Sequence, residues 1–443
     1  MHLNTCSPSG DDAIQRANPQ PAFSQDLFEQ VLQRDNILAA WHRVRANKGA
    51  PGVDGMTIEA FPAWARSGHW KRTATELRVG QYHPAPVRRV EIDKPDGGKR
   101  QLGIPTVTDR VIQQAIAQVL TPIFDPGFSD NSFGFRPHRN GQQAVQQVQR
   151  LIKQGRGFAV DVDLSKFFDR VNHDLLMSKL GAKINNKRLL SLIGQYLRAG
   201  FIANQQRQES REGVPQGGPL SPLLANIMLD PLDKELEKRG HAFARYADDF
   251  TILVRSRRAG ERVLASISRY LQQRLKLVVN ASKSHVVKTS ESKFLGFTFK
   301  TGKILIHPKT LQRFKQQVRR LTNRNWGVAI EYQLFKTSQY LRGWIHYFGI
   351  ANCYQLCVEL DQWIRRRIRM AYWRQWRKPR TKVRNLMSRG VHVRTAVACG
   401  ITSKGPWRSS KTPGIQQALS NAYLKSQGLF ALRDGWIRLH HSK

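Results

Sequence analysis

The sequence predicts an α+β fold up to about residue 302 and a helical fold beyond it. Three observations support this prediction. Apolar and polar residues alternate from Phe158 to Leu164, as in a half-buried strand, with Asp161 and Asp163 on the polar face. Two β-forming runs, 242–245 and 250–254, flank a short polar turn. From Pro308 the apolar residues recur at three- and four-residue steps, which indicates helices.

Composition points to a polyanionic partner. The 443 residues carry a formal net charge of +40, and ten Trp and ten Tyr add stacking capacity. The four cysteines lack zinc-ligand spacing, and the pair Cys353 and Cys357 is expected to pack inside a helix. No secretory segment and no apolar run of about 18 residues is found. We therefore expect a cytoplasmic protein, nucleoid-associated when bound to DNA, that does not enter a membrane.

The N-terminal region predicts a tail, a helix, a loop and a hairpin. Residues 1–22 are polar and Pro-rich, which is typical of a disordered tail. A helix should follow from Phe28 to Trp41. The basic loop 45–55, which contains Lys48, reads either as a linker or as a nucleic-acid contact. Residues 86–105 predict a β-hairpin with basic residues around its turn.

The middle of the chain predicts two core helices. One spans 108–120. The other should begin with Ser221 as N-cap and Pro222 in its first turn, kink at Pro231 and end at Gly240. Between them, Arg136 could contact a phosphate or order its own loop.

The adjacent acids Asp248 and Asp249 need a physical reason, because like charges repel. A solvated turn is the simple explanation. The acidic face of the strand that contains Asp163 supports another, a divalent-metal site. Carboxylates from neighbouring strands can clamp two cations roughly 3.5–4 Å apart in phosphoryl transfer.

These residues occur in an ordered series of motifs. The series comprises Asp163-Leu164-Ser165-Lys166-Phe167-Phe168-Asp169, Gly213–Pro222, Tyr246-Ala247-Asp248-Asp249, Phe294-Leu295-Gly296-Phe297 and Leu341–Phe348. In this order the motifs resemble a reverse transcriptase, and more closely the bacterial group II intron-encoded reverse transcriptase/maturases. The resemblance covers nearly the whole chain after about residue 30. No paired-Cys nuclease motif follows, so the chain resembles the compact branch that lacks the HNH endonuclease domain.

The resemblance implies a right-hand polymerase fold and a domain order. We expect a tail at 1–22, an N-terminal extension with fingers and palm at 23–302, a helical thumb (maturase domain X) at 303–380, and a basic DNA/RNA-binding segment at 381–443. Asp163, Asp248 and Asp249, with the backbone of Leu164, would hold two Mg²⁺ ions, with Mn²⁺ as a substitute.

The resemblance also implies binding residues. Those expected around the nucleotide are Lys94, Arg100, Phe168, Gln216 and Lys283. Lys99 competes with its neighbours for the role at the fingertip, Phe168 could instead be a core residue, and Lys283 a plain surface lysine. Phe294, Leu295 and Gly296 would form the primer grip. From Gln362 to Ser410 there are 14 basic residues and no acids. The expected nucleic-acid contacts are Lys48, Arg365, Arg366, Arg369, Trp373, Arg374, Arg377 and Lys378.

The implied function is RNA-directed DNA synthesis that serves splicing and mobility of an intron. The expected partners are group II intron RNA, an RNA template with a DNA primer, target DNA and deoxynucleoside triphosphates. Three alternatives remain: a related reverse transcriptase used in phage defence, CRISPR adaptation or DNA repair; a splicing factor with an idle polymerase; and a plain DNA-binding protein. The clustered acids argue against the last two.

Overall fold

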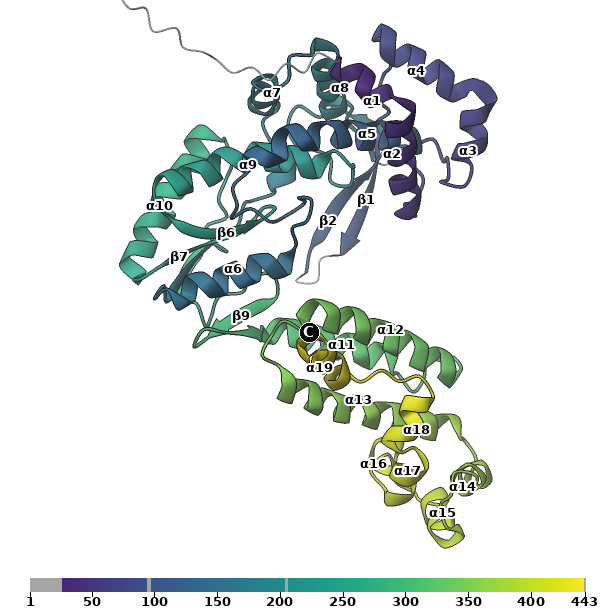
Figure 1. The fold of residues 1–443 in the computed structure, drawn as a ribbon. Helices are drawn as coiled ribbons and strands as arrows, with labels where there is room; N and C mark the ends of the chain where they lie inside the picture. Colours follow the sequence, from purple (N-terminus) through teal and green to yellow (C-terminus); the bar gives the residue numbers. More distant parts are fainter. Residues whose placement is uncertain (1–25, 94–96, 204–205, 442–443) are drawn as a thin grey trace, which may run out of the picture.

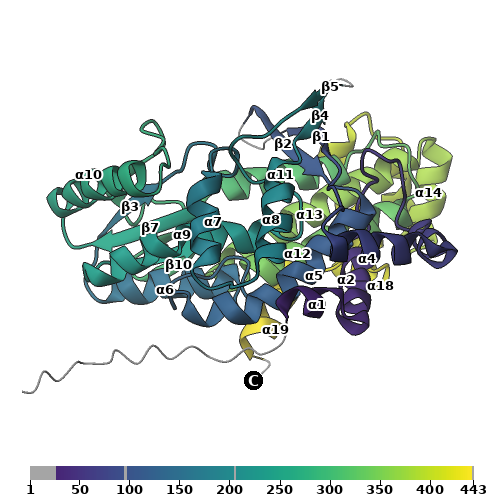
Figure 2. The same cartoon turned by 90° about the horizontal axis from the view of Figure 1, so that it is seen from above.

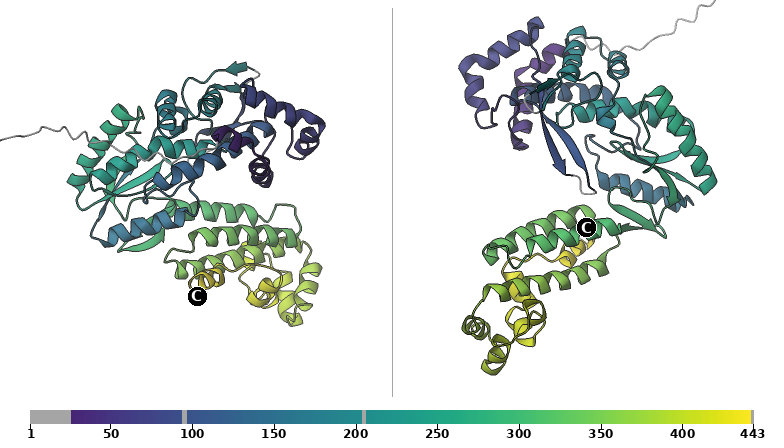
Figure 3. Two further views of the ribbon diagram at one scale, coloured as in Figure 1. Left: turned by 45° about the horizontal axis from the view of Figure 1, so that its top comes forward. Right: turned by 180° about the vertical axis from the view of Figure 1, so that it is seen from behind.

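The computed structural model describes residues 26–93, 97–203 and 206–441. The expected tail at 1–22 and the expected nucleotide ligand Lys94 lie outside the described residues. The chain forms an upper α+β part and a lower helical part, which Figures 1 and 3 show from several sides.

A four-stranded antiparallel sheet forms the centre of the upper part. Its strands, in the spatial order β6-β7-β3-β8, are β6 (Ala242–Tyr246), β7 (Asp249–Val254), β3 (Phe158–Val162) and β8 (His285–Lys288). Val160 and Ile252 pack on one face with α10 (Arg257–Arg274), whereas Ala159 and Leu253 face α6 (Gly141–Lys153). The expected alternation in β3 is confirmed, since Asp161 and Ala159 share a face opposite Val160.

A second four-stranded sheet projects beside the first. Its order is β2-β1-β4-β5, with β1 (Val87–Asp93), β2 (Lys99–Ile104), β4 (Phe201–Ala203) and β5 (Gln206–Gln208). The pairing of β1 with β2 is antiparallel and confirms the expected hairpin, although residues 94–96 of its turn lie outside the described residues. Seen from above in Figure 2, this sheet stands close to the N-terminal helices.

Helices surround both sheets. They are α1 (Leu27–Leu32), α2 (Arg34–Ala46), α3 (Phe61–Trp64), a π-helical turn (Ala65–His69), α4 (Trp70–Val79), α5 (Val107–Phe124), short 3₁₀ turns (Asp125–Gly127 and Phe167–Asp169), α7 (His173–Gly181), α8 (Lys187–Arg198) and α9 (Ser221–Lys238). The single helix expected from Phe28 to Trp41 is wrong. Gln33 adopts an extended conformation, with ψ at 137°, and divides the segment into α1 and α2.

The helix α9 corrects one detail of the sequence prediction. Leu220 is the N-cap residue, and the Ser221 hydroxyl donates a 2.6 Å hydrogen bond to the carbonyl of Pro215 instead of capping the helix. The helix continues through Pro231 to Lys238. Gly240, with φ of +68°, follows its end as expected, and the N–H of His241 donates back to the carbonyl of Leu236.

The lower part begins after a hairpin of β9 (Phe297–Lys300) and β10 (Lys303–Ile306). The three expected thumb helices are present as α11 (Pro308–Leu321), α12 (Ile330–Phe348) and α13 (Tyr354–Gln375). Short helices follow: α14 (Pro379–Met387), α15 (Val393–Gly400), α16 (Pro406–Ser409), α17 (Pro413–Ala418), α18 (Asn421–Ser426) and α19 (Leu432–His441).

The C-terminal helix returns to the thumb, as Figure 1 shows. The carboxylate of Asp361 on α13 accepts the backbone N–H groups of Leu432 at 2.8 Å and of Arg433 at 3.0 Å. Leu432 is fully buried in the same hydrophobic core as Leu360 and Ile364. Residues 381–441 therefore share a core with the thumb, and position 380 does not separate two cores.

Cys353 and Cys357 are buried, with their sulfur atoms 3.8 Å apart, which confirms that the pair packs inside the thumb. Among the residues that the structure describes, we find no helix with the length and apolar character needed to cross a membrane.

Candidate active site

The acidic pair lies on a tight turn between β6 and β7. Tyr246 and Asp249 pair across the two strands, so Ala247 and Asp248 form the turn. Ala247 has φ of +58°, an uncommon conformation for a residue with a side chain, and the surroundings must stabilise it. The turn presents Asp248 at its tip and Asp249 at the start of β7.

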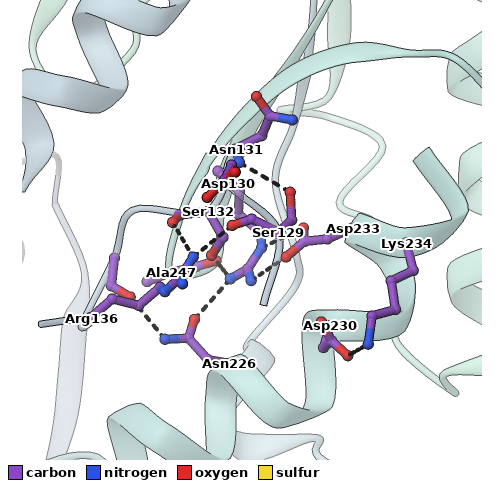
Figure 4. A network of polar contacts seen from close by, with 12 residues as sticks. Ser129, Asp130, Asn131, Ser132, Arg136, Asn226, Asp230, Asp233, Lys234 and Ala247 are labelled. Carbon is purple, nitrogen blue, oxygen red and sulfur yellow. Dashed lines mark hydrogen bonds and ion pairs between the residues drawn. The ribbon is translucent and has the colours of Figure 1, made fainter. Parts of the chain in front are cut away.

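A buried arginine, Arg245, holds this turn. Figure 4 labels three of its partners, Asn226, Asp233 and Ala247. The Arg245 side chain has no exposed surface, and its guanidinium donates to the carbonyl of Ala247 at 2.9 Å and to the Asn226 amide oxygen at 3.0 Å. It also forms a bidentate pair with Asp233 at 2.7 and 2.5 Å. Burial raises the pKa of Asp233, and the Arg245 charge opposes that rise.

A neighbouring segment closes the turn from its other side. The Asn226 amide donates to the carbonyl of Gly134 at 2.8 Å, and the N–H of Phe133 donates to the carbonyl of Arg245 at 2.9 Å. The backbone of Gly134 approaches Ala247 so closely that an added Cβ would lie 2.3 Å from its nitrogen. This segment leaves no room for the turn to move.

Arg136 orders its own loop, which is one of the two roles expected from the sequence. Its side chain is 4% exposed and pairs with Asp125 at 2.7 Å. It also donates to the carbonyls of Ser129 and Ser132, at 2.6 and 2.9 Å. A side chain with these partners cannot reach a phosphate. It orders the loop that supports the turn.

The third expected acid, Asp163, follows the end of β3. Its backbone N–H donates to the Ser284 hydroxyl at 3.0 Å, and its carbonyl accepts the N–H of Asn280 at 2.8 Å. Asp163, Leu164, Asp248 and Asp249 all line one cleft of about 850 Å³. The structure thus brings together the residues expected to bind metal.

Asp161 joins the three acids in the lining of the cleft. It lies opposite Thr251 of β7 and His285 of β8, and it accepts a 3.1 Å hydrogen bond from the Ser292 hydroxyl. The sequence indicated that it shares a face with Asp163 but not that it accepts a hydrogen bond from Ser292.

The electrostatics of the cleft fit a cation. Burial, and then the charges of Asp161, Asp248 and Asp163, raise the pKa of Asp249 to about 7. Its side chain is accessible to water although protein atoms crowd around it. Burial also raises the pKa of Asp248, and the neighbouring Asp163 adds to the rise while Arg100 opposes it. A divalent cation relieves this repulsion, and carboxylate oxygens are its preferred ligands.

The carboxylates do not form a closed cage. Across residues 26–93, 97–203 and 206–441, no group of three or more His, Cys, Asp or Glu side chains is arranged to hold a metal ion by itself. Mg²⁺ commonly binds through one or two carboxylates and completes its shell with water and substrate phosphates. The acids therefore fit an open site that a phosphate-bearing substrate would complete.

The fingertip arginine lies at the cleft, and its neighbour does not. Arg100 lines the cleft, whereas the ammonium of Lys99 pairs with Glu91 at 2.6 Å. Lys283 is exposed and also lines the cleft. Arg100 is therefore the better candidate for the basic residue at the cleft, and the sequence alone did not distinguish it from Lys99.

Phe168 and Gln216 line a smaller hollow of about 190 Å³ beside the β1–β2 hairpin. The Gln216 carbonyl accepts the N–H of Gly103 at 2.7 Å. Phe168 is half-buried and packs against the ring of Phe167, with centroids 5.1 Å apart. These two residues are near each other, but they do not line the cleft of the carboxylates.

The expected primer grip is a tight turn. The backbone groups of Phe294 and Phe297 form two hydrogen bonds across the turn. Leu295 and Gly296, between them, have φ of +50° and +87°. Leu295 and Gly296 line the cleft and Phe294 is buried beneath them.

Thumb side chains that sequence reasoning did not select form the opposite wall of the cleft. They are Lys309, Thr310, Arg313, Phe314, Tyr340, Trp344 and Phe348. In the sequence, the apolar members of this set contribute to the helical periodicity after Pro308, which gives no sign that they line a cleft.

Two expected nucleic-acid contacts are wrong. Trp373 is 1% exposed and belongs to the thumb core. Arg369 is buried and donates to the carbonyl of Leu419 at 2.9 Å, which anchors the C-terminal segment. Arg366 is half-buried and stacks 3.6 Å from the ring centre of Trp407.

The other expected contacts remain on the surface. Arg374, Arg377, Lys378 and Lys48 are exposed, and Arg365 is half-buried.

Gly134→Ala tests the close approach at the turn. The added Cβ would meet two backbone atoms, of Ala247 and Tyr246, which cannot move without shifting Asp248. A displacement of about 1 Å should lower the template-copying rate, the activity implied by the sequence, about a hundredfold. The matched control is Gly157→Ala, because a Cβ at Gly157 meets nothing within 4 Å. Equal copying rates for the two variants would contradict the claim that Gly134 fixes the position of Asp248.

Sequence comparisons agree with this geometry. Residues 92–299 match the reverse transcriptase (RNA-dependent DNA polymerase) family, and residues 311–390 match the group II intron maturase-specific domain. Protein YkfC of Escherichia coli (strain K12) is 32% identical over 322 residues, which cover 62% of this chain and 81% of that protein. The group II intron-encoded protein LtrA of Lactococcus lactis subsp. cremoris is 38% identical over 211 residues, 47% of this chain and 34% of LtrA.

Solved structures give weaker matches. A partial Cas6-RT-Cas1–Cas2 complex aligns with 59% of this chain and 44% of its own, at 27% identity and a TM-score of 0.37. A Candida albicans telomerase aligns with 70% of this chain and 64% of its own, at 13% identity and a TM-score of 0.40. The sequence matches decide the family: the chain belongs to the reverse transcriptases that carry a group II intron maturase domain, which are RNA-directed DNA polymerases of the right-hand fold.

Proposed function

We propose that this protein binds a group II intron RNA, assists its splicing and copies it into DNA for mobility of the intron. The observation that carries the proposal is the joint cleft, in which Asp163, Asp248 and Asp249 of the palm face helices of the maturase-type thumb. One cleft lined by both parts suits an enzyme that holds a primer–template while it extends the primer. We place this activity in the cytoplasm.

Divalent ions, two Mg²⁺ in our proposal, would be held by Asp163, Asp248, Asp249 and the Leu164 backbone. When bound, they would supply charge stabilisation for phosphoryl transfer. Arg100 would meet the triphosphate, since it lines the cleft and lies close enough to Asp248 to oppose the rise in the pKa of that carboxyl. We assign Lys283, Phe168 and Gln216 to the nucleotide's surroundings, and Phe294–Gly296 to the primer end. Phe168 and Gln216 would border the sugar from the neighbouring hollow.

A splicing factor with an idle polymerase is less well supported. Several carboxylates share one partly buried cleft, where burial and then their mutual repulsion raise the pKa of Asp249. A chain without catalytic use for them would be more stable with neutral residues there. A use in phage defence, CRISPR adaptation or DNA repair would keep the same chemistry and change only the RNA that is copied.

Asp248→Asn should abolish primer extension and leave RNA binding almost unchanged. The amide keeps the shape of the side chain and removes a metal-binding charge. Extension of a DNA primer on an RNA template with Mg²⁺ measures the first effect, and RNA affinity measures the second. Asp130→Asn is a suitable control, because Asp130 is an exposed carboxylate that pairs with Arg139 outside the cleft. Near-normal extension by the Asp248 variant would refute the site assignment.

The exposed basic residues at the end of α13 are proposed to bind phosphates of intron RNA or target DNA. Arg374, Arg377 and Lys378 are exposed and follow directly after the buried Trp373. Truncation would not isolate their contribution, because the segment after residue 380 shares the thumb core. Point substitutions keep that core intact.

The triple variant Arg374→Gln, Arg377→Gln, Lys378→Gln should bind RNA with a shallower salt dependence. Each lost phosphate contact lowers the slope of log affinity against log salt by roughly 0.7–0.9, so the total change should be about 2–3. The matched control replaces Arg258, Arg262 and Arg269, three exposed arginines of α10 on the sheet face away from the cleft. Equal slopes for the two triple variants would show that the end of α13 is only a solvated surface.

A further inference from the structure

Three exposed aromatic side chains gather where the loop between α11 and α12 meets α12. Trp326 is 37% exposed, Tyr332 47% and Phe335 58%. The rings of Trp326 and Tyr332 are 5.9 Å apart. We call these three residues the tip cluster. Exposed aromatic groups of this size usually mark a binding surface.

The fold holds the tip cluster in place. The amide of Gln333, which is 1% exposed, donates to the carbonyl of Asn323 at 3.0 Å, and the same carbonyl accepts the N–H of Trp326. The amide of Gln375 on α13 donates to the carbonyl of Val328 at 3.1 Å. The loop is thus tied to both neighbouring helices, and the rings are presented to solvent by a defined backbone.

Positive charge surrounds the rings. The ammonium of Lys336 lies 5.6 Å from the ring centre of Tyr332 and 5.7 Å from that of Phe335. Arg320 and Arg324 are exposed nearby on the chain that leads into the loop. Glu331 is the single acidic residue between Glu291 and Glu359 in the sequence, and its charge acts on Tyr372 of α13.

Part of the tip cluster lies on the same helix as part of the cleft lining. Tyr340, Trp344 and Phe348 line the cleft, and Lys336 and Tyr332 extend the same four-residue spacing towards the start of α12. At a rise of 1.5 Å per residue, Tyr332 lies about 18 Å along the helix axis from Trp344. Tyr332 is also rotated by roughly 120° about the helix axis from Trp344, so the tip cluster is a surface separate from the cleft.

We propose that the tip cluster binds unpaired nucleotides of RNA by stacking bases on its rings. The proposal rests on the proposed function in taking RNA as the ligand. Apolar rings alone would also suit a protein partner, but cations placed over and beside the rings match bases that carry phosphates. A second copy of this chain, with its own basic surface, would be repelled.

The full-length double variant Tyr332→Leu, Phe335→Leu tests the proposal. Fluorescence anisotropy would compare an unstructured RNA of about 20 nucleotides with a duplex of the same length. We expect at least tenfold weaker binding of the single strand, because each stacked base contributes about a tenfold factor or more, and no change for the duplex. The salt slope should not change, because the lost rings carry no charge. The control variant is Tyr354→Leu, which removes a ring that is 44% exposed at the start of α13.

A photo-crosslink gives an independent readout. The same RNA containing 4-thiouridine should crosslink to the peptide that holds the tip cluster in the wild-type protein. Crosslinks only to cleft peptides, equal losses for single strand and duplex, no loss at all, or a change of oligomeric state in the variant would each overturn the proposal. Extension of a pre-annealed primer by the wild-type protein is measured in parallel. Failure of the wild-type protein in that assay would count against the polymerase and not against the tip cluster.

Discussion

The buried ion pair between Arg245 and Asp233 is the interaction on which the site depends. Neither side chain has exposed surface, and the guanidinium binds the carbonyl of Ala247 one residue before Asp248. Loss of one partner would leave an uncompensated charge in the core, which typically costs about 3–5 kcal/mol. The pair therefore anchors the acidic turn to the core of the palm and fixes its position.

The same principle explains why a strained turn can carry repelling acids. Ala247 adopts a positive φ, and Gly134 closes the space behind it. Burial, and after it the charges of the neighbouring carboxylates, raise the pKa of Asp249, so these acids repel one another. A flexible turn would move apart to relieve this repulsion. Here Arg245 and Gly134 hold the turn in place, so the carboxylates stay close together. A divalent cation bound between them would relieve their repulsion.

The strands and the acids could be predicted from the sequence because the signals are local. The alternation around Asp163 fixed its face, and Gly240 marked the end of α9. The partners of Arg245 could not be predicted, since a lone arginine in an apolar strand gives no indication of which distant carboxylate it meets. The capping role assigned to Ser221 is wrong because Ser221 is already the first residue of α9 and Leu220 holds the N-cap position.

The thumb shows the same limit. The mixture of aromatic and basic residues from Gln362 onward was interpreted as one nucleic-acid surface. The segment around Leu419 binds the buried Arg369, and Lys382 of α14 lies 4.8 Å from the ring centre of the buried Trp373. Helical spacing alone cannot reveal that a later segment covers a helix face. The residues that stay exposed there are the basic Arg374, Arg377 and Lys378, whereas the neighbouring Trp373 and Trp376 are buried.

The location of the divalent ions tests the account most directly. Fe²⁺ can replace Mg²⁺ at a carboxylate site, and with ascorbate and peroxide it cleaves the nearby backbone. We predict cuts close to residues 163 and 248 that added Mg²⁺ suppresses and that the Asp248→Asn variant loses. Cuts elsewhere in the chain, or cuts at these two positions that Mg²⁺ does not suppress, would contradict the metal site proposed for Asp163, Asp248 and Asp249.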